Sequence, residues 1–211
     1  MSHPYKSIKL KSGVFEFTLN DQLREKWQAA LTKPIPLFLH NFEPSKKFIS
    51  ITTVDRKTPY LLNLPKIPKK VKEMVYLRGC LEQLFKCSFE YVNFYKSIFN
   101  PEMINILFDN DKTIPHQFNI NDATLFANNE TFKNVLKFSL NHLSISESLT
   151  IDLKNVGITE QHTNILFIIL INKGNKLPKI SLESLKLTNL HDLISEVSRL
   201  KMRTYITKFK V

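Results

Sequence analysis

Glycine is scarce in this chain of 211 residues, which contains only four. This count excludes architectures that depend on many tight glycine turns, and it leaves no glycine-rich loop that could hold a phosphate group. The Gly-x-Ser-x-Gly pattern of hydrolases is also absent. Because no pattern marks a nucleophile, a base and an orienting group together, we predict that the chain is not an enzyme and has no catalytic or cofactor-binding residues.

Cysteine is almost as rare, since Cys80 and Cys87 are the only two. A small secreted domain held by disulfides would contain more, so the cytoplasm or the nucleus is the expected compartment. Six residues separate the two cysteines on a predicted helix, whereas paired zinc ligands typically stand about two to four residues apart. The six histidines form no close pair in the sequence, and we predict no metal site.

Long apolar runs are missing as well. The longest candidate, Ile165–Ile171, is about one third of the roughly 18 residues that a membrane helix needs. Residues 1–10 contain lysines but no apolar block followed by small residues, so the sequence predicts no signal peptide. We therefore expect no membrane partner.

Acidic residues are outnumbered, with 19 aspartates and glutamates against 30 lysines and arginines, for a net charge of +11. Such an excess attracts nucleic acids, acidic proteins and other anions. Lysines gather in residues 66–72, and residues 199–210 contain basic residues and no acid, together with Tyr205 and Phe209. Cations mixed with aromatic rings are typical of single-strand binders, so a basic nucleic-acid-binding protein is the alternative hypothesis for the function.

A repeated pattern is present in the second half of the chain. Residues 151–159 and 180–188 match at every apolar position and both end in threonine, at an offset of 29 residues. Weaker copies occupy residues 118–125 and 89–94. Apolar residues at i and i+2 place two side chains on one face of a short strand, and the terminal threonine can cap a following helix.

Helically spaced apolar residues follow these copies. The predicted helices start after Asn129, Thr159 and Thr188, and the second of them ends at Gly174. Units of strand, turn and helix at this period are typical of leucine-rich repeats of the longer, helix-bearing type, which need about three or more stacked units to be stable. A generic α/β sandwich remains the alternative interpretation.

The predicted fold class is α/β, with leucine-rich-repeat-like strand-turn-helix units in the C-terminal half and a smaller, β-containing N-terminal part. We divide the chain into a β-rich part at 1–63, a leucine-rich-repeat-like domain at 64–200 and a basic C-terminal tail at 201–211. The local patterns predict a hairpin around Gly13, helices at Asp21–Leu31 and Lys69–Lys86, a strand within Lys46–Val54, a proline-punctuated connector at Thr58–Pro68, a short element at Asn100–Phe108 and a strand that starts at Phe118.

His162 and His191 occupy equivalent positions in the two strongest copies, 29 residues apart. Stacked units could bring them together. Two ligands seldom make a metal site, however, so we interpret this pair as an echo of the repeat at solvated helix starts.

Six segments between Leu77 and Leu193 carry a resemblance to a known family, and they are Leu81–Phe85, Phe99–Met103, Ile114–Phe118, Leu125–Asn129, Leu140–Leu143 and Ile158–Lys176. In these residues the chain resembles the nematode F-box-associated proteins. The resemblance covers a little more than half of the chain and lies in the pattern of residues, without a catalytic signature.

The resemblance implies a protein-interaction module for substrate recognition in ubiquitin ligase pathways, because an F-box docks on the adaptor of a cullin ligase and the associated domain presents substrates. The sequence departs from the family where an F-box would be expected. Met1–Asn20 has the pattern of strands, and Leu64-Pro65 is followed by lysines where helical apolar anchors should stand. Coupling to the cullin ligase adaptor is therefore an open question at this point.

Polar residues that alternate with the buried isoleucines and leucines of the repeat define the expected protein-binding surface. In a strand that is buried on one face, the intervening side chains lie on the other face. The predicted surface residues are Thr150, Asp152, Lys154, Ser181, Glu183 and Lys186.

Overall fold

The computed structural model of the protein describes residues 6–8, 19–40, 48–52, 59–94, 97–109, 111, 113–157, 159, 162, 165 and 179–183. The elements in these residues are, in chain order, β1 (Lys6–Ile8), α1 (Asp21–Leu31), β2 (Phe48–Thr52), β3 (Pro59–Asn63), α2 (Val71–Phe85), β4 (Ser88–Asn93), α3 (Pro101–Phe108), β5 (Phe118–Asn128), α4 (Phe132–His142), β6 (Leu143–Asn155) and β7 (Ile180–Glu183).

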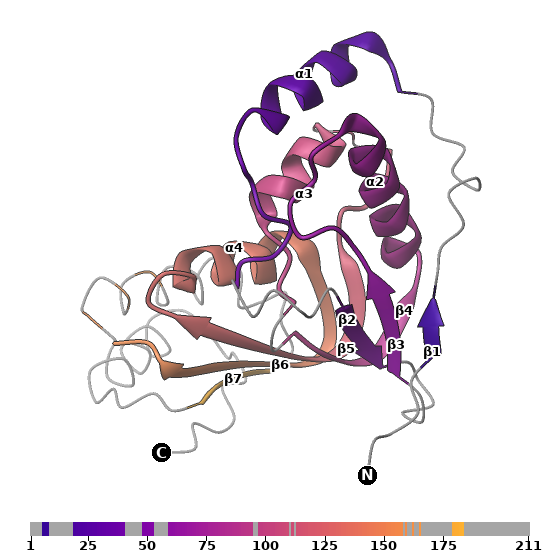
Figure 1. Ribbon diagram of the computed structural model, residues 1–211. Coiled ribbons are helices and arrows are strands. Elements are labelled where there is room, and N and C mark those ends of the chain that lie inside the picture. The colour runs from indigo at the N-terminus through magenta and orange to yellow at the C-terminus, as the bar shows by residue number, and fades with distance from the viewer. Residues whose placement is uncertain are drawn as a thin grey trace.

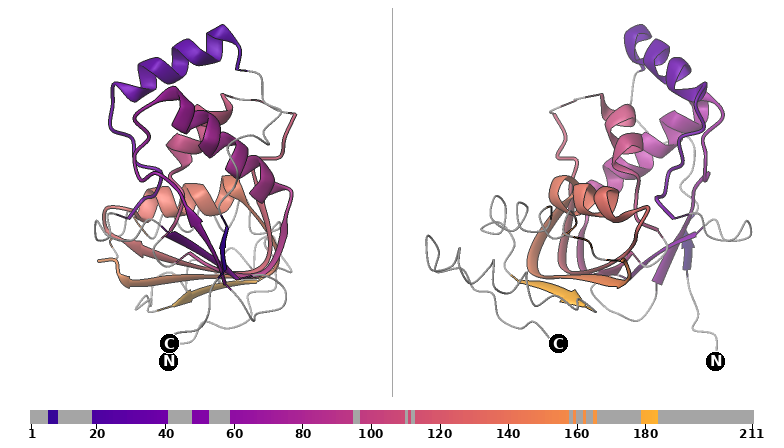
Figure 2. Two further views of the ribbon diagram at one scale, coloured as in Figure 1. Left: turned by 45° about the vertical axis from the view of Figure 1, so that its right-hand side comes forward. Right: turned by 90° about the vertical axis from the view of Figure 1, so that its left-hand side faces the viewer.

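The described strands form one sheet in the order β1-β3-β2-β4-β5-β6-β7. Strands β4 to β7 pair in parallel and in chain order, whereas β2 runs antiparallel to both β3 and β4. Helices α1 to α4 lie on one side of this sheet, with α1 farthest from it (Figure 1). Figure 2 shows that β5 and β6 curve around the helices from below.

The α1 helix begins and packs as its sequence requires. Asn20 is the N-cap, and its side-chain oxygen accepts a hydrogen bond from the amide of Leu23 at 2.8 Å. Leu23 and Trp27, four residues apart, are its buried residues. Because side chains at i and i+4 lie on one helical face, this pair attaches α1 to the other helices. Leu31 at the end of α1 also packs against the core, whereas most other residues of the helix are exposed.

The segment after α1 is held against the start of α3. The amide of Leu39 donates to the carbonyl of Ile98 at 2.9 Å, and the amide of Asn100 donates to the carbonyl of Leu37 at 2.8 Å. Asn100 also caps α3, since its side-chain oxygen accepts from the amide of Glu102 at 3.0 Å. Asn100 therefore caps the N-terminus of α3 and also holds the segment after α1 against it.

Phenylalanine rings fill the space between the helices and the sheet. Phe118, the first residue of β5, is 2% exposed. Its ring centroid lies 4.9 Å from that of Phe85 in α2, 5.3 Å from that of Phe99 before α3, and 6.0 Å from that of Phe138 in α4. Each aromatic pair adds about 0.5–1.5 kcal/mol to the gain from burial. Phe118 therefore joins α2, α4 and the segment before α3 to the sheet.

Irregular positions in β5 and β6 explain how the sheet bends. Along β5 the buried residues Ile120 and Ala123 are three apart, and the pairing with β6 shifts between Ile120 and Asp122. Along β6, Glu147 stands at the alternating position between the buried Ile145 and Leu149, yet it is exposed. Extra residues of this kind break the alternation of a strand and increase its bend and twist.

The mixed α/β class is confirmed, and residues 151–153 and 180–182 belong to adjacent parallel strands as expected. This pairing does not by itself confirm leucine-rich-repeat-like units, because the helix predicted after the second copy lies outside the described residues. The register differs from the match in sequence. Ile151 aligns with Ile180 by repeat but pairs with Leu182, an offset of two residues. An alternating apolar pattern fixes which face of a strand is buried but leaves shifts of two residues undecided.

Predicted elements in the first half are largely found. Helix α1 has the predicted bounds, α2 and α3 lie within the predicted ranges, and β2 lies within Lys46–Val54. The connector at Thr58–Pro68 is a wrong prediction in part, because β3 forms there and pairs with β1 and β2. Its proline, Pro59, stands at the first position of the strand, where a missing amide donor is tolerated.

The junction of α4 and β6 also differs from the prediction. Leu143 continues the helical spacing of Phe132, Leu136 and Leu140, yet it is the first residue of β6. The strand therefore begins eight residues before Ile151, the first residue of the repeat. Leu143 and Ile145 are both buried in this strand. A strand therefore covers the core here as well as a further turn of helix would.

Several predictions concern residues outside the described part of the chain. They are the second strand of the hairpin around Gly13, the helix after Thr188, His191, Lys186 and the basic tail. Of the helix predicted after Thr159, His162 and Ile165 are described and helical, and the Thr159 hydroxyl accepts from the amide of His162 at 3.4 Å. None of the helices in the described residues is long and apolar enough to cross a membrane.

We predict that Phe118→Ala lowers the free energy of unfolding by about 3–5 kcal/mol, because it removes a buried ring that contacts α2, α4 and the segment before α3. Lys137→Ala, on the exposed side of α4, is the control and should change it by less than about 0.5 kcal/mol. Urea unfolding followed by the fluorescence of Trp27, the single tryptophan, measures both. Equal effects of the two substitutions would contradict the central place of Phe118.

Candidate functional site

The sheet surface that faces away from the helices is polar, and we call it the outer sheet face. Its residues are the positions of β4–β7 that alternate with the buried ones. Its central part consists of Tyr91 on β4, Asp122, Thr124 and Phe126 on β5, Ser148, Thr150 and Asp152 on β6, and Ser181 on β7, all partly exposed.

Polar contacts cross the outer sheet face between neighbouring strands. The hydroxyl of Ser146 donates to the side-chain oxygen of Asn121 at 2.6 Å, and the hydroxyl of Ser148 donates to the carboxylate of Asp122. The hydroxyl of Tyr91 lies 3.4 Å from that of Thr124. The two serine contacts lie where the pairing of β5 with β6 shifts, between Ile120 and Asp122, so these side chains support the bend as well as the polarity of the surface.

The structure brings the predicted surface residues together as far as it describes them. Thr150 pairs in register with Ser181, and Asp152 pairs in register with Glu183. Lys154 is exposed near the end of β6, and its amide donates to the carboxylate of Asp152 at 2.8 Å. Of the six residues, Lys186 lies outside the described part of the chain, and for Glu183 the backbone alone is described.

Residues on β4 and β5 extend this surface beyond the prediction. Tyr91 pairs in register with Asp122, and Phe126 pairs in register with Asp152. The weaker copies of the repeat at 89–94 and 118–125 marked these strands, but the prediction used only the two strongest copies. Asp122 and Thr124, polar residues between the apolar positions of the copy at 118–125, were a signal that could have identified β5. Tyr91 stands at an apolar position of the copy at 89–94, and Phe126 lies beyond the copy at 118–125, so the repeat gave no signal for either.

Charge is distributed unevenly between the parallel strands and the rest of the chain. Strands β4–β7 contain one of the chain's 30 lysines and arginines, Lys154, and five of its 19 acidic residues, namely Glu90, Asp122, Glu147, Asp152 and Glu183. The sheet is therefore acidic in a protein whose net charge is +11. An acidic surface repels phosphate groups and attracts cations, so the parallel strands are poorly suited to nucleic acid.

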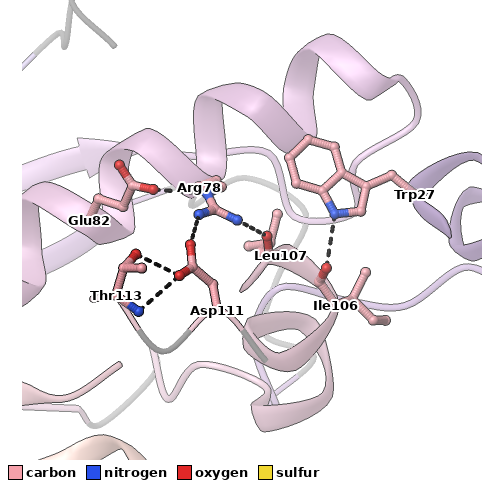
Figure 3. A network of polar contacts seen from close by, with 7 residues as sticks. All are labelled: Trp27, Arg78, Glu82, Ile106, Leu107, Asp111 and Thr113. Atoms are coloured by element: carbon pink, nitrogen blue, oxygen red, sulfur yellow. Dashed lines mark hydrogen bonds and ion pairs between the residues drawn. The ribbon is translucent and has the colours of Figure 1, made fainter. Parts of the chain in front are cut away.

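A second cluster of charged residues surrounds Arg78 on the helical side (Figure 3). The Arg78 side chain is 3% exposed and forms ion pairs with Glu82 at 2.8 Å and Asp111 at 2.5 Å. It also donates to the carbonyl of Leu107 at 3.0 Å, and its guanidinium carbon lies 4.9 Å from the centroid of the Phe108 ring. Two carboxylates, a carbonyl and an aromatic face together compensate for burying this cation.

This cluster closes the C-terminal end of α3. The last carbonyls of a helix have no partner within it. Here the carbonyl of Ile106 accepts from the indole of Trp27 in α1 at 2.8 Å, and that of Leu107 accepts from Arg78 in α2 (Figure 3). Asp109 follows in the left-handed conformation with φ 43°. Together with Trp27, the Arg78 cluster therefore joins α1, α2 and α3. These contacts give the cluster a structural role.

Burial and hydrogen bonding shift the acid-base properties of this side of the protein. Hydrogen bonds from the hydroxyl and amide of Thr113, with a further contribution from Arg78, lower the pKa of Asp111 to about 2. Burial lowers the pKa of His116 and of His142, and His142 Nδ1 lies 3.0 Å from the carbonyl oxygen of His116. Both imidazoles are thus held in the neutral form that the aromatic core favours.

Metal-binding chemistry has no support in the described residues, where no group of three or more histidines, cysteines and acids could hold a metal ion. Cys80 is buried in α2 and Cys87 is exposed just after it, and both are free thiols. Burial raises the pKa of Cys80 to about 11. This thiol is therefore protonated near neutral pH and is a weak nucleophile.

We predict that Asp111→Asn destabilises the protein at pH 7 and that the difference from the unchanged chain shrinks as the pH falls from about 4 to 2. A carboxyl whose pKa is lower in the folded state stabilises that state above its unfolded pKa, and this contribution is lost as the pH falls through the folded pKa. Thermal unfolding at a series of pH values measures the difference. A gap that stays constant down to pH 2 would show that the charge of Asp111 is unimportant.

Comparison with known proteins gives one family. A family model described as Domain of unknown function (DUF8381) matches residues 8–154. No match was found among the curated proteins or among the solved structures. The matched residues include α1 to α4, the Arg78 cluster, β4, β5 and nearly all of β6. The chain therefore belongs to the DUF8381 family.

Proposed function

We propose that this protein is a protein-interaction module that binds its partner through the outer sheet face. The observation that carries the proposal is the arrangement of β4–β7, whose apolar side chains are buried toward the helices while partly exposed polar side chains cover the opposite surface. A side chain on a regular strand has a fixed position, so a surface built this way is rigid and specific. The proposal is for a binding module and includes no catalytic step.

The finer part of this proposal is that the parallel strands form a leucine-rich-repeat-like stack. In its support, β4, β5 and β6 each pair with the next strand in the chain, and α3 and α4 lie between them in sequence. Stacked units of this kind present their strands on one surface and their helices on another. The offset of two residues between repeat and register means that successive units are not identical in detail.

The proposed biological role is substrate recognition of the F-box-associated type, in a ubiquitin ligase pathway. The segments of the resemblance support a shared scaffold, since Leu81–Phe85 closes α2, Phe99–Met103 opens α3 and Ile114–Phe118 enters β5. Many of their side chains belong to the core, as Phe85, Phe99 and Phe118 do. The outer sheet face lies largely outside these segments. We expect the residues of this surface to differ between proteins that share the scaffold, so that each protein recognises its own substrate.

A second candidate function, nucleic-acid binding, is favoured by one specific observation. Lys66, Lys69, Lys70 and Lys72, at the start of α2, are all exposed. Four cations in residues 66–72, just before and at the start of α2, would form a site for phosphate groups that is separate from the acidic strands. This function would therefore use a different surface of the same protein.

We predict that a photo-crosslinking amino acid at position 150 captures a protein partner, whereas the same group at the exposed position 133 of α4 does not. Asp152→Lys should abolish recovery of that partner, because it reverses the charge at the centre of the surface. Affinity purification followed by mass spectrometry measures both, and an unchanged thermal transition shows that the variant is folded. Cullin ligase subunits among the captured proteins would support the ligase role.

Equal capture at positions 150 and 133, or a purification profile that Asp152→Lys leaves unchanged, would remove the outer sheet face as the site of binding. Capture at 150 without any cullin ligase subunit would leave the interaction module in place and remove the proposed ligase role.

For nucleic acid we predict a steep dependence on salt if the lysines at the start of α2 form the site. Substitution of Lys69, Lys70 and Lys72 by glutamine should then weaken binding to random RNA and flatten the salt dependence by about 0.7 per lost contact. Electrophoretic mobility shifts at two salt concentrations measure this. No binding at low salt would remove this second function.

A further inference from the structure

Aromatic rings stand beside carboxylates at two places on the outer sheet face. Tyr91 on β4 pairs in register with Asp122 on β5, and Phe126 on β5 pairs in register with Asp152 on β6. All four residues are partly exposed. The hydroxyl of Tyr91 reaches Thr124, two residues beyond Asp122, so its ring lies along β5.

An aromatic face beside a carboxylate is a chemical environment that suits a cation. The ring attracts a lysine or arginine within about 6 Å of its centroid, and the carboxylate adds an ion pair and a hydrogen-bond acceptor. The surrounding strands contain a single basic residue, Lys154. Aromatic position and charge are separate observations, and both select a basic partner over an acidic one.

The spacing of the two places restricts the shape of the partner. Asp122 and Phe126 are four residues apart on β5, and the pairing with β6 is regular between them. At about 3.3 Å per residue the two places lie roughly 13 Å apart. An extended peptide places side chains i and i+4 on one side at the same separation, whereas side chains i and i+3 lie on opposite sides.

We propose that the outer sheet face binds an extended segment of a partner protein that contains lysine or arginine at positions i and i+4. One cation lies over Tyr91 beside Asp122, and the other lies over Phe126 beside Asp152. This inference rests on the proposed function and adds the chemistry and spacing of what the surface recognises.

The test uses the full chain and short fluorescent peptides in fluorescence anisotropy. One peptide has two arginines at i and i+4 in a serine and threonine background, and its isomer has them at i and i+3. We expect the first to bind about 5-fold to 10-fold more tightly, since its isomer can place only one cation at a time on the surface. Equal affinities of the two peptides would overturn the proposed spacing.

Variants test the two places directly. The double substitution Asp122→Asn with Asp152→Asn should weaken binding of the i, i+4 peptide about 10-fold. Phe126→Leu should weaken it about 3-fold, because it removes the ring and keeps an apolar side chain. The matched control is Glu25→Gln with Glu102→Gln, which removes the same charge from exposed positions on α1 and α3.

An equal loss in the control variant would overturn the proposal, because it would show attraction to net charge alone. A change of oligomeric state in the Asp122 and Asp152 variant, measured by sedimentation without any effect on peptide affinity, would assign the surface to a second copy of the chain and overturn it as well. If the peptides fail to bind while position 150 still captures a partner, the inference fails and the proposed function stands. If both fail, the proposed function fails too.

Discussion

The pairing of β5 with β6 is the interaction on which the rest of the structure depends. It runs from Phe118↔Leu143 to Asn128↔Asn155 and is the longest pairing in the described sheet. Its register decides which side chains meet the helices and which face outward. A slip of one residue would turn Leu149 and Ile151 out of the core and bring Thr150 in, which couples the polarity of the outer sheet face directly to core burial.

The phenylalanine cluster and the Arg78 cluster serve this pairing from the helical side. Phe118 begins β5 at the centre of the ring contacts, so the strand cannot shift without breaking them. Arg78 and Trp27 close the end of α3 and hold α1, α2 and α3 as one unit against the sheet. The helices therefore act as a fixed support, and the chemistry open to a partner lies on the other side.

Local patterns in the sequence predicted the helices better than the sheet. Helices α1, α2 and α3 are set by apolar spacing, caps and prolines that lie within each segment. The β3 strand was missed because it pairs with β1 and β2, which are distant in sequence, and its own prolines suggested a connector. The first part of β6 was missed because Leu143 fits the helical spacing that precedes it. The bulges then hid the register, since the buried Ile120 and Ala123 are three residues apart, and Glu147, between the buried Ile145 and Leu149, is exposed.

Only part of the candidate site could be predicted from the sequence, and the limit has a physical reason. Alternation in residues 149–154 is regular, so Thr150 and Asp152 could be placed on the outward surface from sequence alone. Their neighbours across the sheet, Thr124 and Phe126, follow from the register of β5 with β6, which alternation leaves undecided. The charge contrast between the parallel strands and the rest of the chain likewise became visible only when the strands were known to lie side by side.

The order of the parallel strands has a consequence for how the protein is made. From β4 onward each new strand pairs with the strand that precedes it in the chain. In the sequence, α3 and α4 lie between successive strands. A polypeptide leaving the ribosome thus meets an existing edge each time a new strand emerges, so this part of the sheet can grow during translation. The acidic outer sheet face therefore forms one strand at a time, in the order in which the strands are synthesised. Of the described strands that form it, β7 is the last to be added.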